Sequence, residues 1–336
     1  MNILGLSNQF SGCGYHRVFM PLGFLPGAKS LVTDIPQKEH FARNFDLILY
    51  NRTCIIDQDW QQVKDTLKAK IVCDLDDYWV LPPAHQLHAT YAAIQQRIED
   101  NIKAADLVTV TNERLRQHAL KLNSNVEVIP NGLPFGRNQF TLDKRDSDLI
   151  RIFWAGGSSH EKDMDILRNP IKKLHTHKDK IQMVIGGFTS ENEESKRIWE
   201  RMFSCFTSGG TLPYMKLSGG HPTSYMQLYE NADIMLIPLE KSDWHSCKSN
   251  LKVLEAASKK IPCIVSRVEP YSLDTDAPVL WVDTQKDWNI HLNNLILNPK
   301  LRIDLGEQLY EWAKEKYDLI KINERRKELF KSIIEA

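Results

Sequence analysis

The stretch IMLIPLEKSDWHSCKSNLKVLEAASKKIPCIVS, residues 234–266, contains two short apolar runs separated by a segment of helical period. The runs Ile234–Ile237 and Cys263–Ser266 lack the alternation of a half-exposed strand, so they are typical of strands that helices cover on both faces. Leu251–Ser258 has the apolar spacing of a helix between them. The order strand, helix, strand predicts a parallel α/β unit.

The same alternation occurs in two sets along the chain, before and after a turn-rich stretch at residues 131–150. The predicted strands are Asn2–Leu6, Leu47–Tyr50, Ile71–Asp74, Leu107–Val110 and Val126–Ile129, then Arg151–Ala155, Gln182–Gly186, Ile234–Ile237, Cys263–Ser266 and Val279–Val282. The predicted helices are Asp59–Ala69, Leu87–Ala104, Asn112–Leu122, Asp163–Leu174, Glu193–Phe206, Ser224–Asn231, Leu251–Ser258 and the long helical stretch Leu301–Ile334. We therefore expect two Rossmann-like domains that face each other across a cleft, residues 1–140 and 150–310, with a helix over 311–336 that packs back towards the first.

Composition narrows the class of protein. The 336 residues include 43 Lys plus Arg and 43 Asp plus Glu, so a protein that works through bulk positive charge is excluded, although a local basic groove is not. No apolar run reaches the length of a membrane-spanning helix, and the N-terminus does not have the pattern of a secretory signal. The six cysteines are scattered without zinc-like spacing, which indicates a reduced cytoplasmic enzyme without a metal site.

The first glycine-rich segment lies between the first predicted strand and a helix. Because ligands of open α/β sheets bind beyond the carboxyl ends of the strands, the amides of Gly12 and Gly14 are candidates to face a diphosphate, with His16 or Arg17 turned into the cleft. His16 is thereby a candidate catalytic residue. The spacing differs from the dinucleotide fingerprint, which argues against NAD, and an ordinary flexible turn remains the alternative.

Carboxylates gather after the third predicted strand. Asp74, Asp76 and Asp77 fall within four positions, more than a helix cap or turn requires, although that simpler interpretation stays open. A single short run is a poor metal site, so we expect Asp76 or Asp77 to contact the acceptor hydroxyl or to act in catalysis.

A second glycine pair follows the first strand of the second half. Gly157 permits close approach to a ligand, Ser158 offers a hydroxyl, and Lys162 adds charge near a helix N-terminus. This set suits phosphate oxygens and is not a P-loop. The alternative is a helix cap followed by a solvated lysine.

The strongest group of candidate residues lies between the two strands of the opening stretch. Lys248, Ser249 and Asn250 are placed to bind a diphosphate at the start of a helix, and Lys248 is also a catalytic candidate. Lys252 and Glu255 lie four and seven residues beyond Lys248 on one helical face, where Glu255 can accept both ribose hydroxyls. The simpler alternative is a surface ion pair between Lys252 and Glu255.

These motifs resemble GT-B glycosyltransferases, specifically the large retaining group that includes glycogen and sucrose synthases. The resemblance is carried by Ala232–Pro238, by Lys248-Ser249-x-x-Lys252-x-x-Glu255-Ala256, by Ile261-Pro262 with Ser266, by Gly156–Asp163 and by Pro130-Asn131-Gly132. It implies an acceptor domain followed by a donor domain, with Glu255 on the ribose and Lys248 and Ser249 on the diphosphate. The chain departs from the family at Cys247, where many relatives have the first of two glutamates, and at Gly157, where many have arginine.

The resemblance implies transfer of a sugar from a nucleoside-diphosphate sugar, with UDP as the expected nucleotide, to a hydroxyl acceptor. It also implies retention of configuration and no permanently bound metal or cofactor. A sugar-nucleotide epimerase and a non-catalytic sugar-nucleotide-binding protein remain alternatives.

The acceptor is open between a glycan and a hydroxymethylated base in DNA. Asp76-Asp77-Tyr78-Trp79-x-Leu81-Pro82 and Gly14-Tyr15-His16-Arg17-x-x-x-Pro21 resemble segments of bacterial and bacteriophage glycosyltransferases, some of which modify DNA in the infected cell. A basic stretch is suited to DNA phosphates, or is simply a solvated helix face; it comprises Arg168, Lys172, Lys173, Lys178 and Lys180. The oligomeric state stays open.

Overall fold

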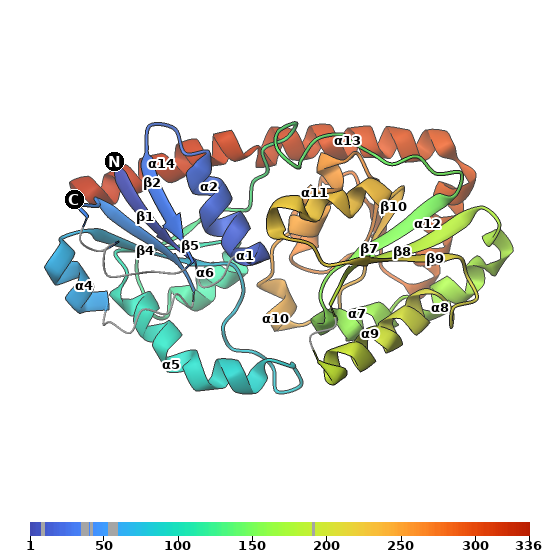
Figure 1. Cartoon of the computed structure of the whole chain (residues 1–336), viewed down its shortest axis with the longest axis horizontal. Coiled ribbons are helices and arrows are strands. Elements are labelled where there is room, and N and C mark those ends of the chain that lie inside the picture. Colours follow the sequence, from blue (N-terminus) through green and yellow to red (C-terminus); the bar gives the residue numbers. More distant parts are fainter. Residues whose placement is uncertain (8–10, 35–39, 41–42, 53–59, 190–191) are drawn as a thin grey trace. The chain divides into compact units, whose positions relative to one another are not determined.

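A computed structural model describes residues 1–7, 11–34, 40, 43–52, 60–189 and 192–336 (Figure 1). The chain forms two compact units. The first comprises Met1–Gly132, Ser246–Ser249 and Tyr317–Ala336, and the second comprises Leu133–His245 and Asn250–Lys316. The chain therefore passes through the first unit three times, and the short passage at Ser246–Ser249 lies in the middle of the second unit's sequence.

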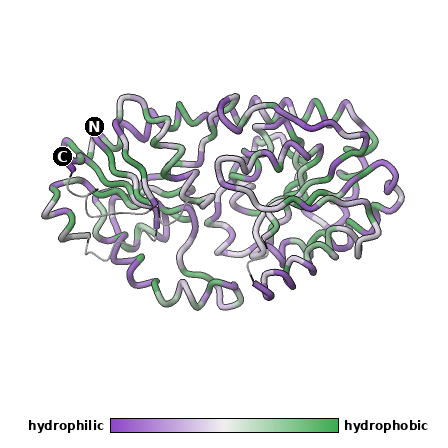
Figure 2. The backbone as a smooth tube through the Cα atoms, in the orientation of Figure 1, coloured by the Kyte–Doolittle hydropathy of each residue, from purple (hydrophilic) through white to green (hydrophobic). Residues whose placement is uncertain are grey.

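The first unit is built on a six-stranded parallel sheet with the order β2-β1-β3-β4-β5-β6. Its strands are β1 (Asn2–Leu6), β2 (Lys29–Thr33), β3 (Leu47–Asn51), β4 (Lys70–Leu75), β5 (Leu107–Val110) and β6 (Val126–Val128). The central strands β3 and β5 are buried along their whole length, as their unbroken apolar runs require in a sheet covered on both faces. Figure 2 shows these strands as hydrophobic segments in the interior of the unit.

Helices cover both faces of this sheet. They are α1 (Gly12–Gly14), the π-helix η1 (Tyr15–Phe19), α2 (Met20–Gly23), α4 (Trp60–Leu67), α5 (His88–Ala104), α6 (Glu113–Ala119) and α14 (Leu319–Glu335). One core packs Ile98 and Ile102 of α5 and Leu115 of α6 against the sheet. The core on the other face contains Val18 of η1 and Phe330 of α14, so the last helix closes a face that the N-terminal half leaves apolar.

The second unit repeats the plan with the order β12-β11-β10-β7-β8-β9, again with every pair parallel. Its strands are β7 (Ile150–Ala155), β8 (Ile181–Phe188), β9 (Tyr214–Ser218), β10 (Ile234–Ile237), β11 (Cys263–Ser266) and β12 (Leu280–Val282). Its helices are α7 (Glu161–Asp165), α8 (Arg168–Lys172), α9 (Glu193–Phe206), α10 (Asp243–Ser246), α11 (Leu251–Ser258), α12 (Gln285–Leu297) and α13 (Pro299–Tyr317). One large core contains the buried rings of Trp154, Trp199 and Trp288.

Most predicted strands and helices are present, and the predicted α/β class with parallel sheets is confirmed. Strands β2 and β9 were not predicted, because both are edge strands with partly exposed residues and therefore lack a continuous apolar run. Helix α12 was also not predicted. The start of the predicted helix Asp59–Ala69 lies outside the described residues; α4 begins at Trp60.

Three predicted helices were wrong in detail. The predicted helix at 224–231 is two 3₁₀ segments, Pro222–Gln227 and Tyr229–Asn231. The predicted helix at 163–174 divides between α7 and α8, because Pro170 cannot donate a backbone hydrogen bond to the turn before it. The C-terminal stretch is α13 and α14, separated at Asp318, whose carboxylate accepts a hydrogen bond from the Ile320 amide at 2.9 Å and caps the second helix.

No helix in the described part of the chain is both long enough and apolar enough to cross a membrane.

The packing of α14 gives a stability prediction. Phe330 is 1% exposed and belongs to the core that α14 completes. Phe330→Ala should destabilise the first unit by about 3–5 kcal/mol, because the lost apolar contacts leave a cavity. Urea unfolding monitored by circular dichroism measures this change. The neighbouring exposed change Lys331→Ala is the control and should leave the midpoint nearly unchanged. Equal midpoints for the two variants would show that α14 does not stabilise the fold.

Candidate functional site

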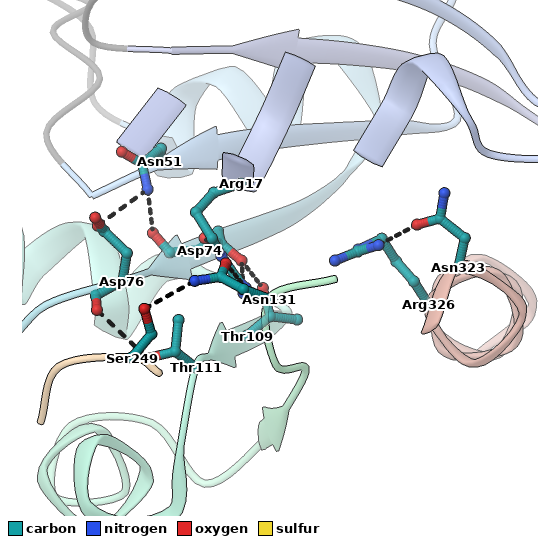
Figure 3. Close-up of polar contacts among 10 residues, drawn as sticks. All are labelled: Arg17, Asn51, Asp74, Asp76, Thr109, Thr111, Asn131, Ser249, Asn323 and Arg326. Carbon is teal, nitrogen blue, oxygen red and sulfur yellow. Dashed lines mark hydrogen bonds and ion pairs between the residues drawn. The ribbon is translucent and has the colours of Figure 1, made fainter. Parts of the chain in front are cut away.

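A buried ion pair lies at the carboxyl edge of the first unit's sheet (Figure 3). Arg17 of η1 donates from Nε and Nη2 to the two carboxylate oxygens of Asp74 on β4, each at 2.8 Å. The Thr109 hydroxyl of β5 donates to the same carboxylate at 2.6 Å. Arg17 is 1% exposed and Asp74 is 2% exposed, so this bidentate pair is almost fully enclosed. Both oxygens of the Asp74 carboxylate accept hydrogen bonds.

Asparagines extend this network to the inserted segment. Arg17 Nη1 donates to Asn131 Oδ1 at 3.0 Å, and Asn131 Nδ2 donates to Ser249 Oγ at 2.9 Å (Figure 3). Asn112, after β5, donates to the Lys248 carbonyl at 2.5 Å. The Cys247 side chain is fully buried in the apolar core of the first unit. The side-chain amides of Asn112 and Asn131 and the buried Cys247 thiol therefore hold Ser246–Ser249 in the first unit.

A second charged group lies beside this network. Asp76 Oδ1 is 3.7 Å from Arg52 Nη2 and accepts from Asn51 Nδ2 at 3.4 Å. Asp77 is 3.7 Å from Lys248 Nζ and 4.0 Å from Arg52 Nη1. Burial raises the pKa of Asp76, but Arg52, the Cys13 thiol, Arg17 and Asn51 together outweigh it and leave the pKa below its usual value. Asp76 is therefore held as a weakly basic anion, whereas Asp77 is the more exposed carboxylate.

Some first-unit predictions are corrected by this geometry. Gly12–Gly14 is a short helix and not a loop, and the Ser11 side chain caps it by accepting from the Gly14 amide at 3.3 Å. Arg17 does not turn outward, because its guanidinium is taken up by Asp74 and Asn131. His16 is 7% exposed, so it is a buried residue of η1.

Glycines define the carboxyl edge of the second unit's sheet. A Cβ at Gly187 (φ +97°) would lie 2.3 Å from the Gly156 carbonyl oxygen, so only glycine fits beside the loop after β7. A Cβ at Gly156 would lie 3.1 Å from Lys252 Nζ. The Lys252 ammonium also lies 5.1 Å from the centre of the Trp154 ring. The structure thus brings α11 and the glycine pair Gly156–Gly157 together.

Glu255 lies on α11 and is 4% exposed. The Tyr229 hydroxyl donates to its Oε2 at 2.6 Å. Burial raises the pKa of Tyr229, and the neighbouring carboxylate raises it further, so this tyrosine stays a proton donor. The contact fixes the orientation of the Glu255 carboxylate.

The start of α7 carries a further polar pair. The buried Asp163 carboxylate is 2.6 Å from His160 Nδ1 and accepts from the Glu240 amide at 2.8 Å. Burial raises the pKa of Asp163, but His160 and the amide outweigh it, so the pKa is lowered. Ser158 is half-buried and Lys162 is exposed, both close to Gly157 in the chain.

The predicted group at 248–255 is divided between the two units. Lys248 and Ser249 belong to the first, and Asn250, Lys252 and Glu255 to the second. Helix α11 begins only at Leu251, with Asn250 as its cap, so the prediction that Lys248 shares a helical face with Lys252 and Glu255 was wrong. Asn250 Nδ2 donates to Asp274 at 2.7 Å.

Sequence reasoning did not single out Arg52, although the signal was available. Arg52 directly follows β3, at the same edge where Asp76 and Asp77 follow β4. The rule that the residues after each parallel strand face a ligand applies to it equally. Among the described residues, no cluster of three or more His, Cys, Asp or Glu side chains has the arrangement of a metal site.

The predicted basic stretch lies apart from these residues. Lys178 and Lys180 directly precede β8 and are exposed, which places them at the amino edge of the sheet. Gly156 and Gly187, in contrast, lie at the carboxyl edge. Arg168 is held by Asp165 at 2.5 Å. Lys178 and Lys180 therefore lie at the other edge of the sheet from the glycines.

Comparison with solved structures identifies the fold. Sucrose-phosphate synthase from Thermosynechococcus elongatus is 13% identical, with a TM-score of 0.67 and 99% of each chain covered. Anabaena Alr3699/HepE in complex with UDP and glucose is 14% identical, with a TM-score of 0.67 over 99% of this chain and 100% of that one. An E. coli trehalose-6-phosphate structure bound with UDP-2-fluoro glucose is 11% identical, with a TM-score of 0.67 over 98% and 99% of the two chains.

The chain has the GT-B fold. No family model and no curated protein matches the sequence. At this level of identity the comparison establishes the GT-B fold alone, so the chemistry has to be argued from the residues at the two sheet edges.

The Arg17–Asp74 pair gives a second stability prediction. Arg17→Met should cost about 3–5 kcal/mol, because it leaves the buried Asp74 carboxylate without its cation. Arg325→Met is the matched control, since it removes an exposed ion pair with Glu127 at 3.2 Å and should cost at most about 1 kcal/mol. Thermal unfolding of both variants measures the difference. Similar losses of stability would show that burial adds nothing to the Arg17–Asp74 pair.

Proposed function

We propose that the protein is a glycosyltransferase that moves a sugar from a nucleoside-diphosphate sugar, with UDP as the nucleotide, to a hydroxyl acceptor. The observation that carries this proposal is the close approach of Lys252 to Gly156 at the carboxyl edge of the second sheet, on the helix α11 that also carries Glu255. That edge is where open α/β sheets bind nucleotides. The UDP and UDP-sugar bound to two of the similar structures support the choice of donor.

In this proposal the second unit holds the donor. Glu255, oriented by Tyr229, accepts hydrogen bonds from the ribose hydroxyls. Lys252 and the backbone at Gly157 and Ser158 neutralise the diphosphate, and Lys162 adds a mobile charge. No resident cofactor is required, because the nucleotide sugar is consumed as a substrate.

The reaction needs stabilisation of the departing nucleotide. When the bond between the sugar C1 and the diphosphate oxygen breaks, its electron pair stays on the diphosphate, where the positive charge of Lys252 counts most. The acceptor oxygen forms the new bond to C1, and its proton passes to a phosphate oxygen of the departing nucleotide. We further propose that configuration is retained and that no metal ion takes part. Nuclear magnetic resonance of the product anomer and activity in EDTA test these two points separately. An inverted anomer would contradict the first, and a loss of activity that added metal restores would contradict the second.

We propose that the first unit holds the acceptor hydroxyl. Asp77 is half-buried and makes ion-pair contacts at 3.7 and 4.0 Å with Lys248 and Arg52. It is therefore the better candidate for contact with the acceptor than Asp76, which is more buried and is already hydrogen-bonded to the Cys13 thiol and to Asn51. Gly12, Gly14 and His16 belong to the helical segment after β1 at the same edge of the sheet.

A DNA acceptor receives no support from this arrangement, because Lys178 and Lys180 of the basic stretch that suggested it lie at the opposite edge of the second sheet from the glycines. Incubation with UDP-sugars and hydroxymethylcytosine DNA, followed by mass analysis of the nucleosides, tests it directly. Transfer of a sugar to the modified base would overturn this assignment. Interconversion of two UDP-sugars without any acceptor would instead identify an epimerase, and UDP-sugar binding without turnover a binding protein.

The ribose contact gives the first functional prediction. Glu255→Gln should weaken binding of both UDP and uridine by about 1–3 kcal/mol, because the amide has one acceptor oxygen where the carboxylate has two. Isothermal titration calorimetry with each ligand measures the loss. Glu194→Gln, on the exposed face of α9, is the control and should bind as the wild type does. Unchanged uridine affinity in Glu255→Gln would remove Glu255 from the ribose.

The diphosphate contact gives a complementary prediction. Lys252→Ala should weaken UDP binding by about 1.5–3 kcal/mol, because it removes a charged hydrogen-bond donor from the phosphates. Uridine has no phosphate, so its affinity should stay the same. The ratio of the two dissociation constants is the measurement, and it cancels any general damage to the nucleotide site. An equal loss for both ligands would contradict a phosphate role.

A further inference from the structure

Arg52 and Asp77 form an unusual pair at the carboxyl edge of the first sheet. Arg52 has a left-handed backbone (φ +34°) directly after β3, a strained conformation for a residue with a side chain. Its side chain is 12% exposed, and its guanidinium lies 5.4 Å from the centre of the Tyr91 ring. Strain of this kind persists only where the surrounding structure holds the residue in place, and it concentrates at functional sites.

Among the described residues, neither the Arg52 guanidinium nor the Asp77 carboxylate has a full set of hydrogen-bond partners. Asp77 is 4.0 Å from Arg52 Nη1 and 3.7 Å from Lys248 Nζ, and Arg52 Nη2 is 3.7 Å from Asp76, all longer than hydrogen bonds. Within the part of the chain that the structure describes, Arg52 Nε is buried without a hydrogen-bond partner. A buried donor without a partner costs stability, so the site retains this capacity for a ligand.

The chemistry of the pair selects among ligands. An anionic group would satisfy Arg52 but would be repelled by Asp76 and Asp77. A cationic group would satisfy the carboxylates but would be repelled by Arg52 and Lys248. A hydroxyl group both donates and accepts, so two neighbouring hydroxyls can donate to Asp77 and accept from Arg52 at once. The two cations and two carboxylates balance, which also favours an uncharged ligand.

We propose that Arg52 and Asp77 bind two neighbouring hydroxyls of an uncharged polyhydroxy acceptor, a neutral glycoside and not a sugar acid or sugar phosphate. This inference rests on the proposed function only in naming the ligand as the acceptor. The binding itself belongs to the first unit and is measured without turnover. Arg52 and Asp77 are thus specificity-determining residues of the acceptor site.

The test titrates the full-length protein with neutral methyl glycosides of glucose, galactose and mannose, and with the uronic acid and 6-phosphate counterparts of each. Saturation-transfer nuclear magnetic resonance reports binding. At least one neutral glycoside should bind, and its acidic counterparts should bind at least about tenfold more weakly. Arg52→Met should weaken the neutral glycoside about 10- to 100-fold, and Arg52→Lys by less, because it keeps the charge but loses the guanidinium geometry. Arg325→Met is the matched control and should bind as the wild type does.

Asp77→Asn distinguishes a site for neutral glycosides from a site for acidic sugars. The amide keeps one acceptor and loses the charge, so the neutral glycoside should bind more weakly while the uronic acids and phosphates bind more tightly. Acidic sugars that bind the wild type as tightly as neutral ones would overturn the proposal. So would the absence of any neutral binding, or neutral binding that Arg52→Met leaves unchanged. UDP affinity is measured in the same samples. If the wild-type protein does not bind UDP, the proposed function is contradicted, while the glycoside result still stands.

Discussion

The buried contact between Arg17 and Asp74 is the constraint on which the first unit depends. A guanidinium and a carboxylate at 2.8 Å, both almost fully enclosed, are stable in the interior only if every strong donor and acceptor is used. Thr109 and Asn131 supply the remaining partners, and through them the ends of β4 and β5, the helix after β1 and the chain after β6 are held together. Because Asn131 also donates to Ser249, the same network reaches the inserted segment. One buried ion pair therefore links the segments at the carboxyl edge of the first sheet.

Cys247 shows how the chain uses a position at which the resembling family has a glutamate. A glutamate there would have to lie in the apolar core that Cys247 occupies, at a large desolvation cost. The small thiol instead packs into this core, and the next residue, Lys248, lies at the edge of the sheet with its ammonium 3.7 Å from Asp77.

The sequence was sufficient to predict the parts of the fold that rest on continuous apolar runs. Strands such as β5, β10 and β11 were predicted with correct bounds, because a strand that is buried on both faces has a continuous apolar run in its sequence. Edge strands β2 and β9 carry no such run. The passage of Ser246–Ser249 through the first unit was also beyond prediction, since it depends on hydrogen bonds to Asn112 and Asn131, more than 110 residues away in the chain.

In the candidate site, too, some features could be predicted from the sequence and others could not. Several charged residues that follow a strand were found by position alone, although Arg52 after β3 was missed, and the contacts that decide the roles of these residues were not predicted. Nothing in the sequence distinguishes Asp74, which pairs with Arg17, from Asp77, which lies three residues later in a half-buried setting. Both are aspartates at the carboxyl end of the same buried strand, Asp74 within β4 and Asp77 just after it. Only the spacing of the charged atoms separates a pair that stabilises the fold at 2.8 Å from a set at 3.7–4.0 Å that retains its capacity for a ligand. The hydrogen bonds that a buried charge lacks are therefore as informative about function as those it makes.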